Sequence, residues 1–286
     1  MLAVIVSGLA VGSIYAITAL SYNLMYATSK VLSVTTGHIC MLGGVFGAWF
    51  TTVLRWPMPL AILGAVGIGI LFGLLTELVA VRRVLARSDE HLWLLSTLAL
   101  ATMTQQAVAL WWGTEPRPFP RLIPQDFTHG AGDQKFWLPI GVMVLAAVGL
   151  ELFYRRTMWG KLFQATSEDA FAARARGVST DRVRMLSYAI AGALGGLGGF
   201  AAGQLTFAYF ALGLTLTLNG FIAIAVGGLG STVGALVGGL ALGLLSAFAT
   251  YWFGGEFQQT IAVGLLMLVL LIRPEGLFGA RGVRAV

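Results

Sequence analysis

The residues that could carry out chemistry are few, and their spacing does not assemble a catalytic site. The three histidines, His38, His91 and His129, lie far apart, and no His-Glu-x-x-His, Cys-x-x-Cys or paired-carboxylate pattern occurs. Cys40 is the only cysteine, so an internal disulfide and a thiolate metal cluster are both excluded. We therefore expect no catalytic residue, no metal site and no cofactor of the chain's own.

The chain also lacks a nucleotide-binding loop. Gly160 and Lys161 are followed by Leu162 instead of Ser or Thr, and no glycine lies five residues before Gly160. The glycine-rich run at 227–232 lacks the Gly-Lys-Ser/Thr ending. Any energy for uphill transport must therefore come from another subunit or from an ion gradient.

Carboxylates at membrane depth would point to ion coupling, because they are costly there and usually functional. Only Glu77 and Glu151 fall within apolar segments, and both lie close to an end that carries basic residues. There each carboxylate can reach water or pair with Arg82 or Arg155. The sequence therefore gives little support for an ion-driven carrier.

An arginine-rich stretch at 155–184 is the most polar segment of the chain, with seven of the 18 Lys and Arg residues. Within it, the run from Thr166 to Asp169 has the form of a capping box, in which Thr166 caps a helix and Asp169 reaches back to its start. The pattern predicts a helix over 167–176 that ends at Gly177, a residue suited to a left-handed stop.

This predicted helix is amphipathic and too short to be stable alone. Phe171, Ala175 and Val178 share one face, and charged side chains occupy the others. A helix of about ten residues is marginal in water, so a partner would stabilise it. The partner could be lipid headgroups that attract the arginines, or a groove in another protein.

The rest of the sequence is apolar enough to lie in a membrane. Hydrophobic residues make up 57% of the 286 residues and charged residues 10%, with a mean hydropathy of +0.84. This leaves too little polar surface for a soluble domain. The net charge of +6 lies in short loops between apolar segments, which is typical of membrane topology signals and not of nucleic-acid binding. We expect one all-α polytopic membrane domain over 1–286, in contact with lipid.

A transmembrane helix needs about 20 mostly apolar residues, and about eight or nine segments meet this requirement. They are approximately 2–27, 34–54, 58–81, 91–112, 137–154, 185–204, 211–229, 231–251 and 257–272. The segment at 34–54 opens with polar and small residues, so it either crosses as a broken helix or re-enters.

The distribution of basic residues predicts the orientation. An N-terminus outside and a C-terminus in the cytoplasm place most of the 18 Lys and Arg residues inside. The stretch at 155–184 is then a cytoplasmic loop, and the proline-rich segment at 113–136 is the main external loop. The residues left outside are Arg55, Arg117, Arg121 and Lys135.

Many of the 38 glycines recur at helical spacing, which allows helix backbones to touch in lipid. The clearest runs are Gly192, Gly196, Gly199 and Gly203 in one span, and Gly230, Gly234 and Gly238 in another. These runs predict close helix packing.

Uncharged polar side chains inside the spans are candidates for a translocation path suited to a zwitterion or a small amide. Each of them could instead hydrogen-bond to a neighbouring helix. We expect the path to use Asn23, Thr35, Thr36, His38, Gln204 and Asn219, and Gln105 and Gln106 are further polar residues within spans.

Four motifs in order resemble the H-type membrane permeases of bacterial ABC importers for branched-chain amino acids, and their urea and amide relatives. The opening motif is GLAVGSIYAITAL at 8–20, and the loop motif is GKLFQATSEDAFAARARGV at 160–178. The late motifs are NGFIAIAVGGLGSTVGALVGG at 219–239 and LLIRPEGLFG at 270–279. The resemblance covers nearly the whole chain.

The resemblance implies an ABC importer permease fold in the bacterial inner membrane. Two cytoplasmic ATPase subunits, which hold ATP and magnesium, a second related permease in a heterodimer and a periplasmic solute-binding protein would be its partners. The loop at 155–184 would carry the coupling helix that docks into the ATPase. The implied coupling residues are Thr166, Glu168, Asp169, Phe171, Ala172, Arg174, Ala175, Gly177 and Val178.

The chain departs from the family pattern in one segment. Many H-type permeases have N-F-A-H-G before M-L-G, whereas Ser33 and Thr36 stand here in place of the Asn and the His, and His38 follows Gly37. We expect a branched-chain or other hydrophobic amino acid as the substrate. Urea, short amides and small aromatic or carboxylic compounds are the alternative within the same class, and a stand-alone channel or ion-coupled carrier is the alternative outside it.

Overall fold

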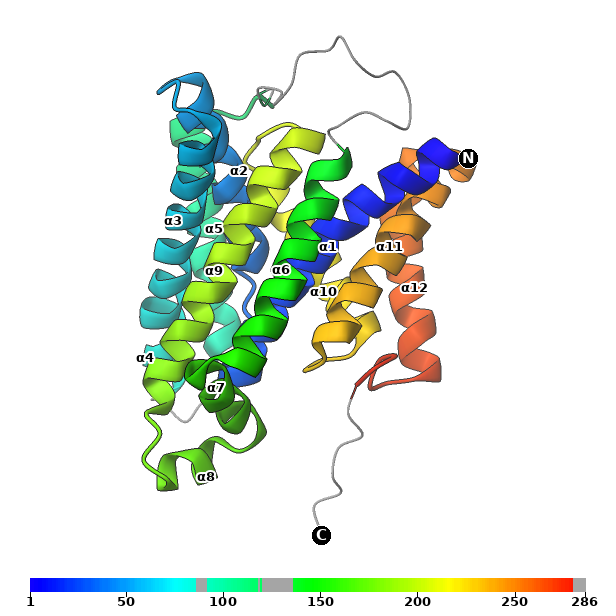
Figure 1. Cartoon of the computed structure of the whole chain (residues 1–286). Helices are drawn as coiled ribbons and strands as arrows, with labels where there is room; N and C mark the ends of the chain where they lie inside the picture. The colour runs from blue at the N-terminus through cyan, green and yellow to red at the C-terminus, as the bar shows by residue number, and fades with distance from the viewer. Residues whose placement is uncertain (86–91, 118, 120–135, 280–286) are drawn as a thin grey trace.

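The computed structural model describes residues 1–85, 92–117, 119 and 136–279 (Figure 1). These residues form helices, joined by short irregular segments and one isolated bridge between Arg117 and Ala208. The helices are α1 (Leu2–Ser29), α2 (Thr36–Thr52), α3 (Met58–Leu75), the π-helix η1 (Thr76–Val81), α4 (Arg82–Leu85), α5 (Leu92–Trp112), α6 (Trp137–Arg156), α7 (Met158–Glu168), α8 (Ala170–Ala175), α9 (Thr180–Leu205), α10 (Leu212–Gly227), α11 (Thr232–Phe253), the 3₁₀-helix η4 (Gly255–Phe257) and α12 (Gln258–Ile272).

The all-α membrane architecture expected from the sequence is confirmed. Among the described residues, six helical segments are long and apolar enough to cross a membrane: Leu2–Ser29, Met58–Val84, Trp137–Arg156, Thr180–Leu205, Thr232–Phe253 and Gly255–Ile272. The other three predicted spans are also helices, α2, α5 and α10. The first and last of these have 17 and 16 residues, so by length alone they do not establish a crossing.

The helix α9 lies at the centre of the bundle and packs against α1, α2 and α3, and α1 crosses obliquely to reach α11 (Figure 1). Glycines make the contact between α3 and α9 close. A Cβ atom added to Gly69 would lie 2.2 Å from the carbonyl oxygen of Gly192, and one added to Gly196 would lie 2.5 Å from that of Ala65. Glycine is therefore required for this approach, as the spacing predicted.

The second glycine run is only partly helical. Gly234 and Gly238 lie in α11, where added Cβ atoms would meet the backbone of α10. Gly230 lies before the helix, with a φ of +88°, in a turn that only glycine adopts readily. The prediction that Gly230 belongs to a packing face is therefore wrong, because this residue forms the turn between α10 and α11.

The segment between α1 and α2 is irregular, whereas the predicted break within 34–54 is wrong, because α2 is continuous from Thr36 to Thr52. The helix α1 ends at Ser29, and residues 30–35 run to α2 without helical structure, with Val31 and Ser33 buried. Side chains satisfy part of this backbone, because Ser29 Oγ accepts a hydrogen bond from Val31 N and Thr217 Oγ1 donates one to the carbonyl of Val34. Irregular backbone inside a membrane protein is tolerated where protein buries it in this way.

Candidate docking site and buried polar residues

The segment between α6 and α9 begins with a sharp break at Thr157. This residue ends α6 and caps α7, and its hydroxyl accepts a hydrogen bond from Gly160 N at 2.9 Å. A Cβ atom on Gly160 would lie 2.1 Å from the carbonyl oxygen of Phe153, so glycine lets α7 fold back against the end of α6. The sequence motif did not predict α7 as a separate helix.

Packing and one hydrogen bond fix α7 on the bundle. Phe163 is buried, and its ring lies 5.3 Å from that of Tyr154 in α6. Lys30, the residue that ends α1, donates a hydrogen bond from Nζ to the carbonyl of Ser167 at 2.9 Å. The base of the loop is therefore held by two membrane-spanning helices.

The short helix α8 has its own cap, and the predicted capping box is wrong. Asp169 Oδ1 accepts hydrogen bonds from the backbone N–H groups of Phe171 and Ala172, so Asp169 caps α8. Thr166 lies inside α7, where its hydroxyl donates to the carbonyl of Leu162. The segment predicted as one helix over 167–176 is instead the end of α7 and a six-residue α8.

The predicted stop at Gly177 is confirmed, with a φ of +87°. Val178 N donates to the carbonyl of Ala173, and Gly177 N donates to that of Arg174. These two bonds form a Schellman motif, which satisfies the free carbonyls at the end of α8.

The exposure of the predicted docking residues differs from one residue to the next. Phe171 is 84% exposed and Ala175 is exposed, whereas Ala173 is 6% exposed and Val178 is half-buried against the core. Val178 therefore does not share an open face with Phe171, because the Schellman turn directs it inward. Of the remaining predicted docking residues, Thr166 is buried, and Glu168, Asp169, Ala172, Arg174 and Gly177 are exposed.

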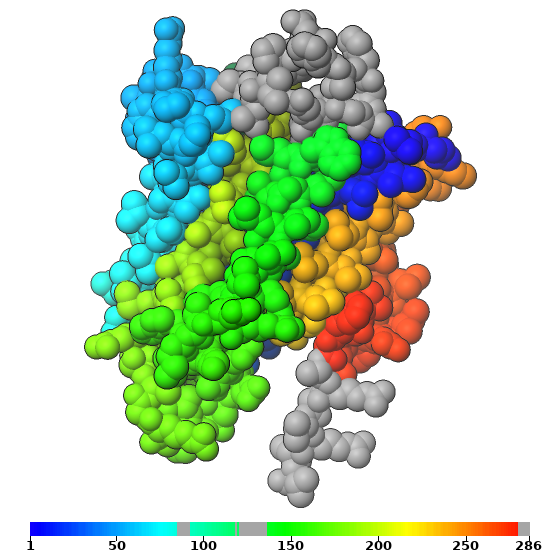
Figure 2. All heavy atoms as spheres, viewed as in Figure 1, coloured from blue at the N-terminus to red at the C-terminus, as the bar shows by residue number. Residues whose placement is uncertain are grey.

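The helix α8 stands at the outermost end of the described chain, beyond the ends of α4 and α12 (Figure 1). In the space-filling view the segment from α7 to the start of α9 forms a protrusion at this end of the molecule (Figure 2). Phe171 is the large hydrophobic side chain of α8 that is exposed on this protrusion.

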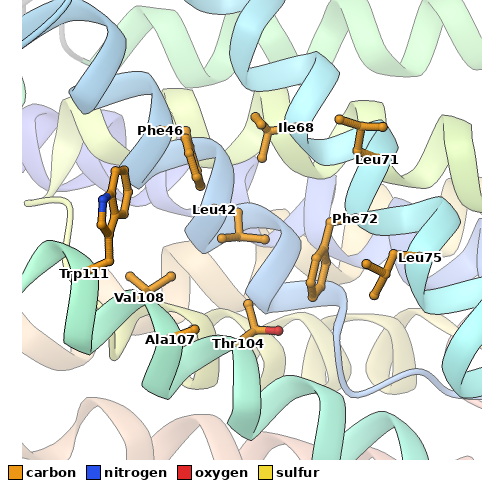
Figure 3. A pocket seen from close by; sticks show the side chains of 10 residues that line it. All are labelled: Leu42, Phe46, Ile68, Leu71, Phe72, Leu75, Thr104, Ala107, Val108 and Trp111. Carbon is orange, nitrogen blue, oxygen red and sulfur yellow. The ribbon is translucent and has the colours of Figure 1, made fainter.

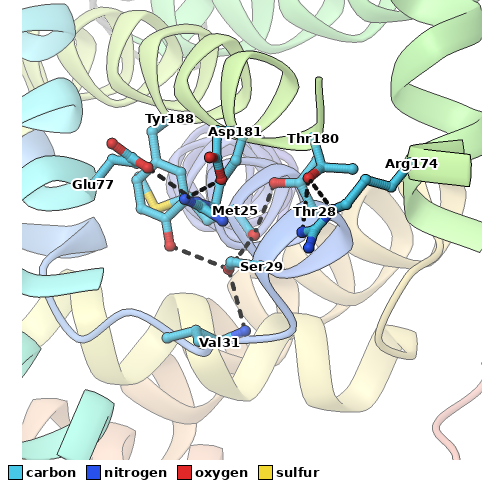
Figure 4. A network of polar contacts seen from close by, with 10 residues as sticks. Met25, Thr28, Ser29, Val31, Glu77, Arg174, Thr180, Asp181 and Tyr188 are labelled. Carbon is cyan, nitrogen blue, oxygen red and sulfur yellow. Dashed lines mark hydrogen bonds and ion pairs between the residues drawn. The ribbon is translucent and has the colours of Figure 1, made fainter. Parts of the chain in front are cut away.

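A polar network lies directly behind this protrusion (Figure 4). The guanidinium of Arg174 donates to Thr180 Oγ1 at 2.9 Å and ties α8 to the first turn of α9. One turn further on, Arg184 pairs with Asp181 at 2.9 Å and with Glu77 of η1 at 3.0 Å. The side chain of Glu77 is 0% exposed.

The ion pair of Glu77 differs from the one expected, whereas the ion pair of Glu151 is the one expected. Glu77 reaches neither water nor Arg82, because η1 turns its carboxylate toward α9 and Arg184. Glu151 pairs with Arg155 on the exposed face of α6, as predicted. The partner of Glu77 was missed because it lies 107 residues away in the sequence.

Three residues predicted for the path lie together where α2 begins. The hydroxyls of Thr35 and Ser33 lie 2.7 Å apart, and Thr36 donates to the carbonyl of Ser33. His38 Nε2 lies 3.4 Å from Gln105 Oε1 of α5, and its ring packs so close to Gly213 of α10 that a Cβ there would lie 2.9 Å away. This cluster joins α2, α5 and α10.

The other predicted path residues lie in α1, α9 and α10. Asn219 donates to the carbonyl of Thr215 in its own helix, and Asn23 is buried in α1. Gln204 is half-buried near the opposite end of α9 from α8 (Figure 1). Their role in a path stays a prediction.

An apolar cavity of about 450 Å³ lies between α2, α3 and α5 (Figure 3). Thr104 contributes the only hydroxyl among its lining residues, which include Phe46, Phe72 and Trp111. Such walls offer no group for acid–base chemistry and no charged ligand for an ion. Among the described residues, no group of His, Cys, Asp and Glu could hold a metal.

Comparisons with known proteins agree with this architecture. Residues 4–272 match the family described as "Branched-chain amino acid transport system / permease component". The chain is 14% identical to "PsaBC from Streptococcus pneumoniae in complex with Fab", with a TM-score of 0.55 over 95% of this chain and 92% of that chain. This second likeness concerns the fold alone.

Curated relatives match the chain from end to end. The high-affinity branched-chain amino acid transport system permease protein BraD of Pseudomonas aeruginosa is 30% identical, over 99% of this chain and 97% of the relative. The corresponding protein LivH of Escherichia coli K12 is 28% identical, over 98% of this chain and 96% of the relative. The galactofuranose transporter permease protein YtfT of Escherichia coli K12 is 25% identical, over 94% of this chain and 80% of the relative. The chain therefore belongs to the family of permease components of branched-chain amino acid transport systems, and it is an integral membrane permease subunit of an ABC transporter.

Proposed function

We propose that this chain forms the translocation path of an inner-membrane importer together with a second, related permease subunit. Two cytoplasmic ABC ATPases, which hold ATP and magnesium, drive the transport, and a periplasmic binding protein delivers the substrate. The observation that carries the docking role is Phe171, 84% exposed at the tip of α8. A water-facing aromatic side chain on a capped, firmly anchored helix is suited to insertion into a groove of another protein.

The position of α8 favours a protein partner over lipid headgroups. The helix lies beyond the ends of the membrane-spanning helices, whereas a helix resting on lipid lies in the plane of the interface (Figure 1). Its caps at Asp169 and Gly177 hold a six-residue helix that would not persist alone. The partner therefore meets a preformed helix, which lowers the entropy cost of docking.

Substitution of Phe171 by Asp tests this role, because a buried charge in the groove of the ATPase is costly. We expect Phe171→Asp to abolish copurification of the ATPase subunits with the permease, and Ala175→Arg to weaken it. Phe207→Asp is the matched control, since Phe207 is 56% exposed and follows the end of α9 opposite to α8. Undiminished copurification of Phe171→Asp would refute docking through α8.

The ends of the helices support the orientation that we propose. The basic residues of α4, α6, α7, α8 and the start of α9 gather at the end that carries α8, and the N-terminal end of α1 lies at the opposite end (Figure 1). Basic residues favour the cytoplasmic side. The N-terminus is then periplasmic, the C-terminus is cytoplasmic, and α2, α5 and α10 complete a total of nine crossings.

The path lies beside α5, where two polar side chains interrupt an exposed surface that is otherwise apolar. Gln106 and Thr102 are exposed on this helix, and Gln105 contacts His38 behind them. Polar groups of this kind are unfavourable against lipid, so this face is suited to the second permease and to the substrate between the two subunits. His38, Thr35 and Thr36 stand closest to that face, and Asn23, Gln204 and Asn219 contribute elsewhere along the path.

A branched-chain or other hydrophobic amino acid is the substrate that we propose. Its support is the family match and the relatives named for branched-chain amino acid transport. An uncharged path with hydroxyl, amide and imidazole groups suits a zwitterion, whose two charges can each be hydrogen-bonded without an opposite charge in the protein. Competition of leucine, isoleucine and valine for uptake tests this assignment, and preference for urea or an amide would contradict it.

A further inference from the structure

The cytoplasmic ends of α3 and α9 are joined by a regular series of contacts that ends in a buried ion pair. Gly69 approaches Gly192, and Gly73 approaches Tyr188 so closely that an added Cβ would lie 2.3 Å from its carbonyl oxygen. One turn beyond Gly73, in η1, the next residue in the series is Glu77, and one turn before Tyr188 in α9 it is Arg184. The ion pair is therefore the last contact in an antiparallel series.

Arg184 is the ion-pair partner of Glu77 among the described residues. The Glu77 carboxylate is 0% exposed, Oε1 accepts the bond from Arg184 at 3.0 Å, and Oε2 has no hydrogen-bond partner among the described residues. A buried carboxylate with one partner becomes an uncompensated charge when that partner moves away. The contact between η1 and α9 therefore resists separation more strongly than an exposed ion pair would.

The same arginine is close to the base of α8. Arg184 bonds Asp181, and the neighbouring residue Thr180 accepts the bonds from Arg174 of α8. Tyr188, one turn beyond Arg184, has its hydroxyl 3.2 Å from that of Ser29 at the end of α1 (Figure 4). Three separate polar contacts from the first turns of α9 thus reach α8, η1 and α1. π-helical turns are rare in proteins, and those that occur are often at functional sites.

We infer that Glu77 and Arg184 are positioning residues that make α8, the start of α9 and η1 move as one rigid unit. This inference rests on the proposed docking of α8 to the ATPase. Force applied to α8 is then passed to α3 and α9, the two helices that the glycine contacts already hold together, and is not absorbed in the loop. Without the ion pair, α8 can still dock, but its displacement reaches α3 only weakly.

A distance measurement on the assembled complex tests this directly. Spin labels are placed at Val79→Cys in η1 and Arg176→Cys after α8, both exposed, with Cys40 replaced by alanine. Pulsed electron paramagnetic resonance then measures the distance between the labels with and without bound ATP. We expect the mean distance to differ between the two states by less than the width of the measured distance distribution. A distance that changes with nucleotide would overturn the inference without any further substitution.

A second measurement uses Glu77→Gln, which removes the charge and keeps the size of the side chain. We expect the ratio of substrate transported to ATP hydrolysed to fall about fivefold or more, with ATPase copurification unchanged, and the label distance to broaden. Glu151→Gln is the matched control, because Glu151 also pairs with an arginine at this end but is 55% exposed. An unchanged ratio and an unchanged label distance in Glu77→Gln would overturn the inference.

The outcomes separate this inference from the proposed docking. If Phe171→Asp retains the ATPase subunits, docking through α8 fails. If Phe171→Asp loses the ATPase subunits, docking through α8 stands. If the label distance in the spin-labelled chain then varies with nucleotide, only the rigid connection fails. If Glu77→Gln does not assemble, Asp181→Asn is measured instead. This variant weakens the second ion pair of Arg184, and it is better tolerated because the Asp181 side chain is 56% exposed.

Discussion

His38 and Asn23 are the two residues of the candidate path with a buried polar atom that has no hydrogen-bond partner among the described residues. His38 Nε2 faces Gln105 Oε1 at a long 3.4 Å, and Nδ1 of the same ring has no partner among the described residues. A buried polar atom without a partner costs free energy, so such an atom is available to a passing polar ligand. Nδ1 is enclosed by protein on the side of the Val34 carbonyl, so a substrate could reach it only after the surrounding helices move.

His38→Ala tests this role at the scale of one residue. Loss of one hydrogen bond to the substrate corresponds to about 1 kcal/mol, so we expect KM for uptake to rise about fivefold. Because His38 is held by packing and one weak contact, the yield of assembled complex is expected to stay unchanged. Cys40→Ala, two residues along the same helix and also buried, is the control. Normal uptake kinetics in His38→Ala would remove this residue from the path.

The residues that act through local sequence were the easiest to predict. Gly177 was recognised as a helix stop because the left-handed conformation is a property of the residue itself. Thr166 was misassigned as a cap because Thr, Asp and Glu within four positions allow more than one cap, and the packing of α7 against α6 decides which is used. The partner of Glu77 depends on tertiary contact, which spacing along the chain does not show.

At the scale of elements, the contact between α3 and α9 is predicted to be the most sensitive to a single methyl group. A Cβ atom at Gly69 would lie 2.2 Å from a backbone oxygen of α9, whereas one at Gly67, two residues earlier in the same helix, would meet nothing within 4 Å. Overpacking of this kind costs about 1–3 kcal/mol, and backbone cannot move aside as a flexible side chain can.

We therefore expect Gly69→Ala to lower the thermal unfolding midpoint of the purified chain in detergent. Gly67→Ala is the matched control and should leave the midpoint unchanged or raise it, because alanine favours a helix by about 1 kcal/mol over glycine. Equal midpoints for the two variants would show that the backbones of α3 and α9 are not in close contact.

An apolar helix such as α11 could be placed from sequence to within two residues, whereas α9 begins five residues before its predicted start because its first turn is charged. The helix α7 could not be placed from sequence, because its eleven residues mix apolar, hydroxyl and charged side chains in a pattern typical of a loop. Its formation depends on Phe163 packing against α6 and on the close approach of Gly160. Local propensity alone does not supply such stabilisation.

At the scale of the whole molecule, the chain presents two exposed surfaces that we propose are covered by other subunits. The face that carries α5 leaves Gln106 exposed, and α8 leaves Phe171 exposed, at two separate surfaces. The first is suited to a second permease within the membrane, and the second is suited to an ATPase outside it. Family membership and overall architecture could be predicted from four sequence motifs, whereas these two surfaces required the positions of the helices.

Uptake of labelled leucine into proteoliposomes tests the central claim most directly. The vesicles contain this chain with its companion permease and two ATPase subunits, and the binding protein is added outside. We predict accumulation that requires ATP inside, the binding protein and the ATPase subunits, and that Phe171→Asp abolishes. Accumulation of leucine by vesicles that contain the purified chain alone would contradict the account.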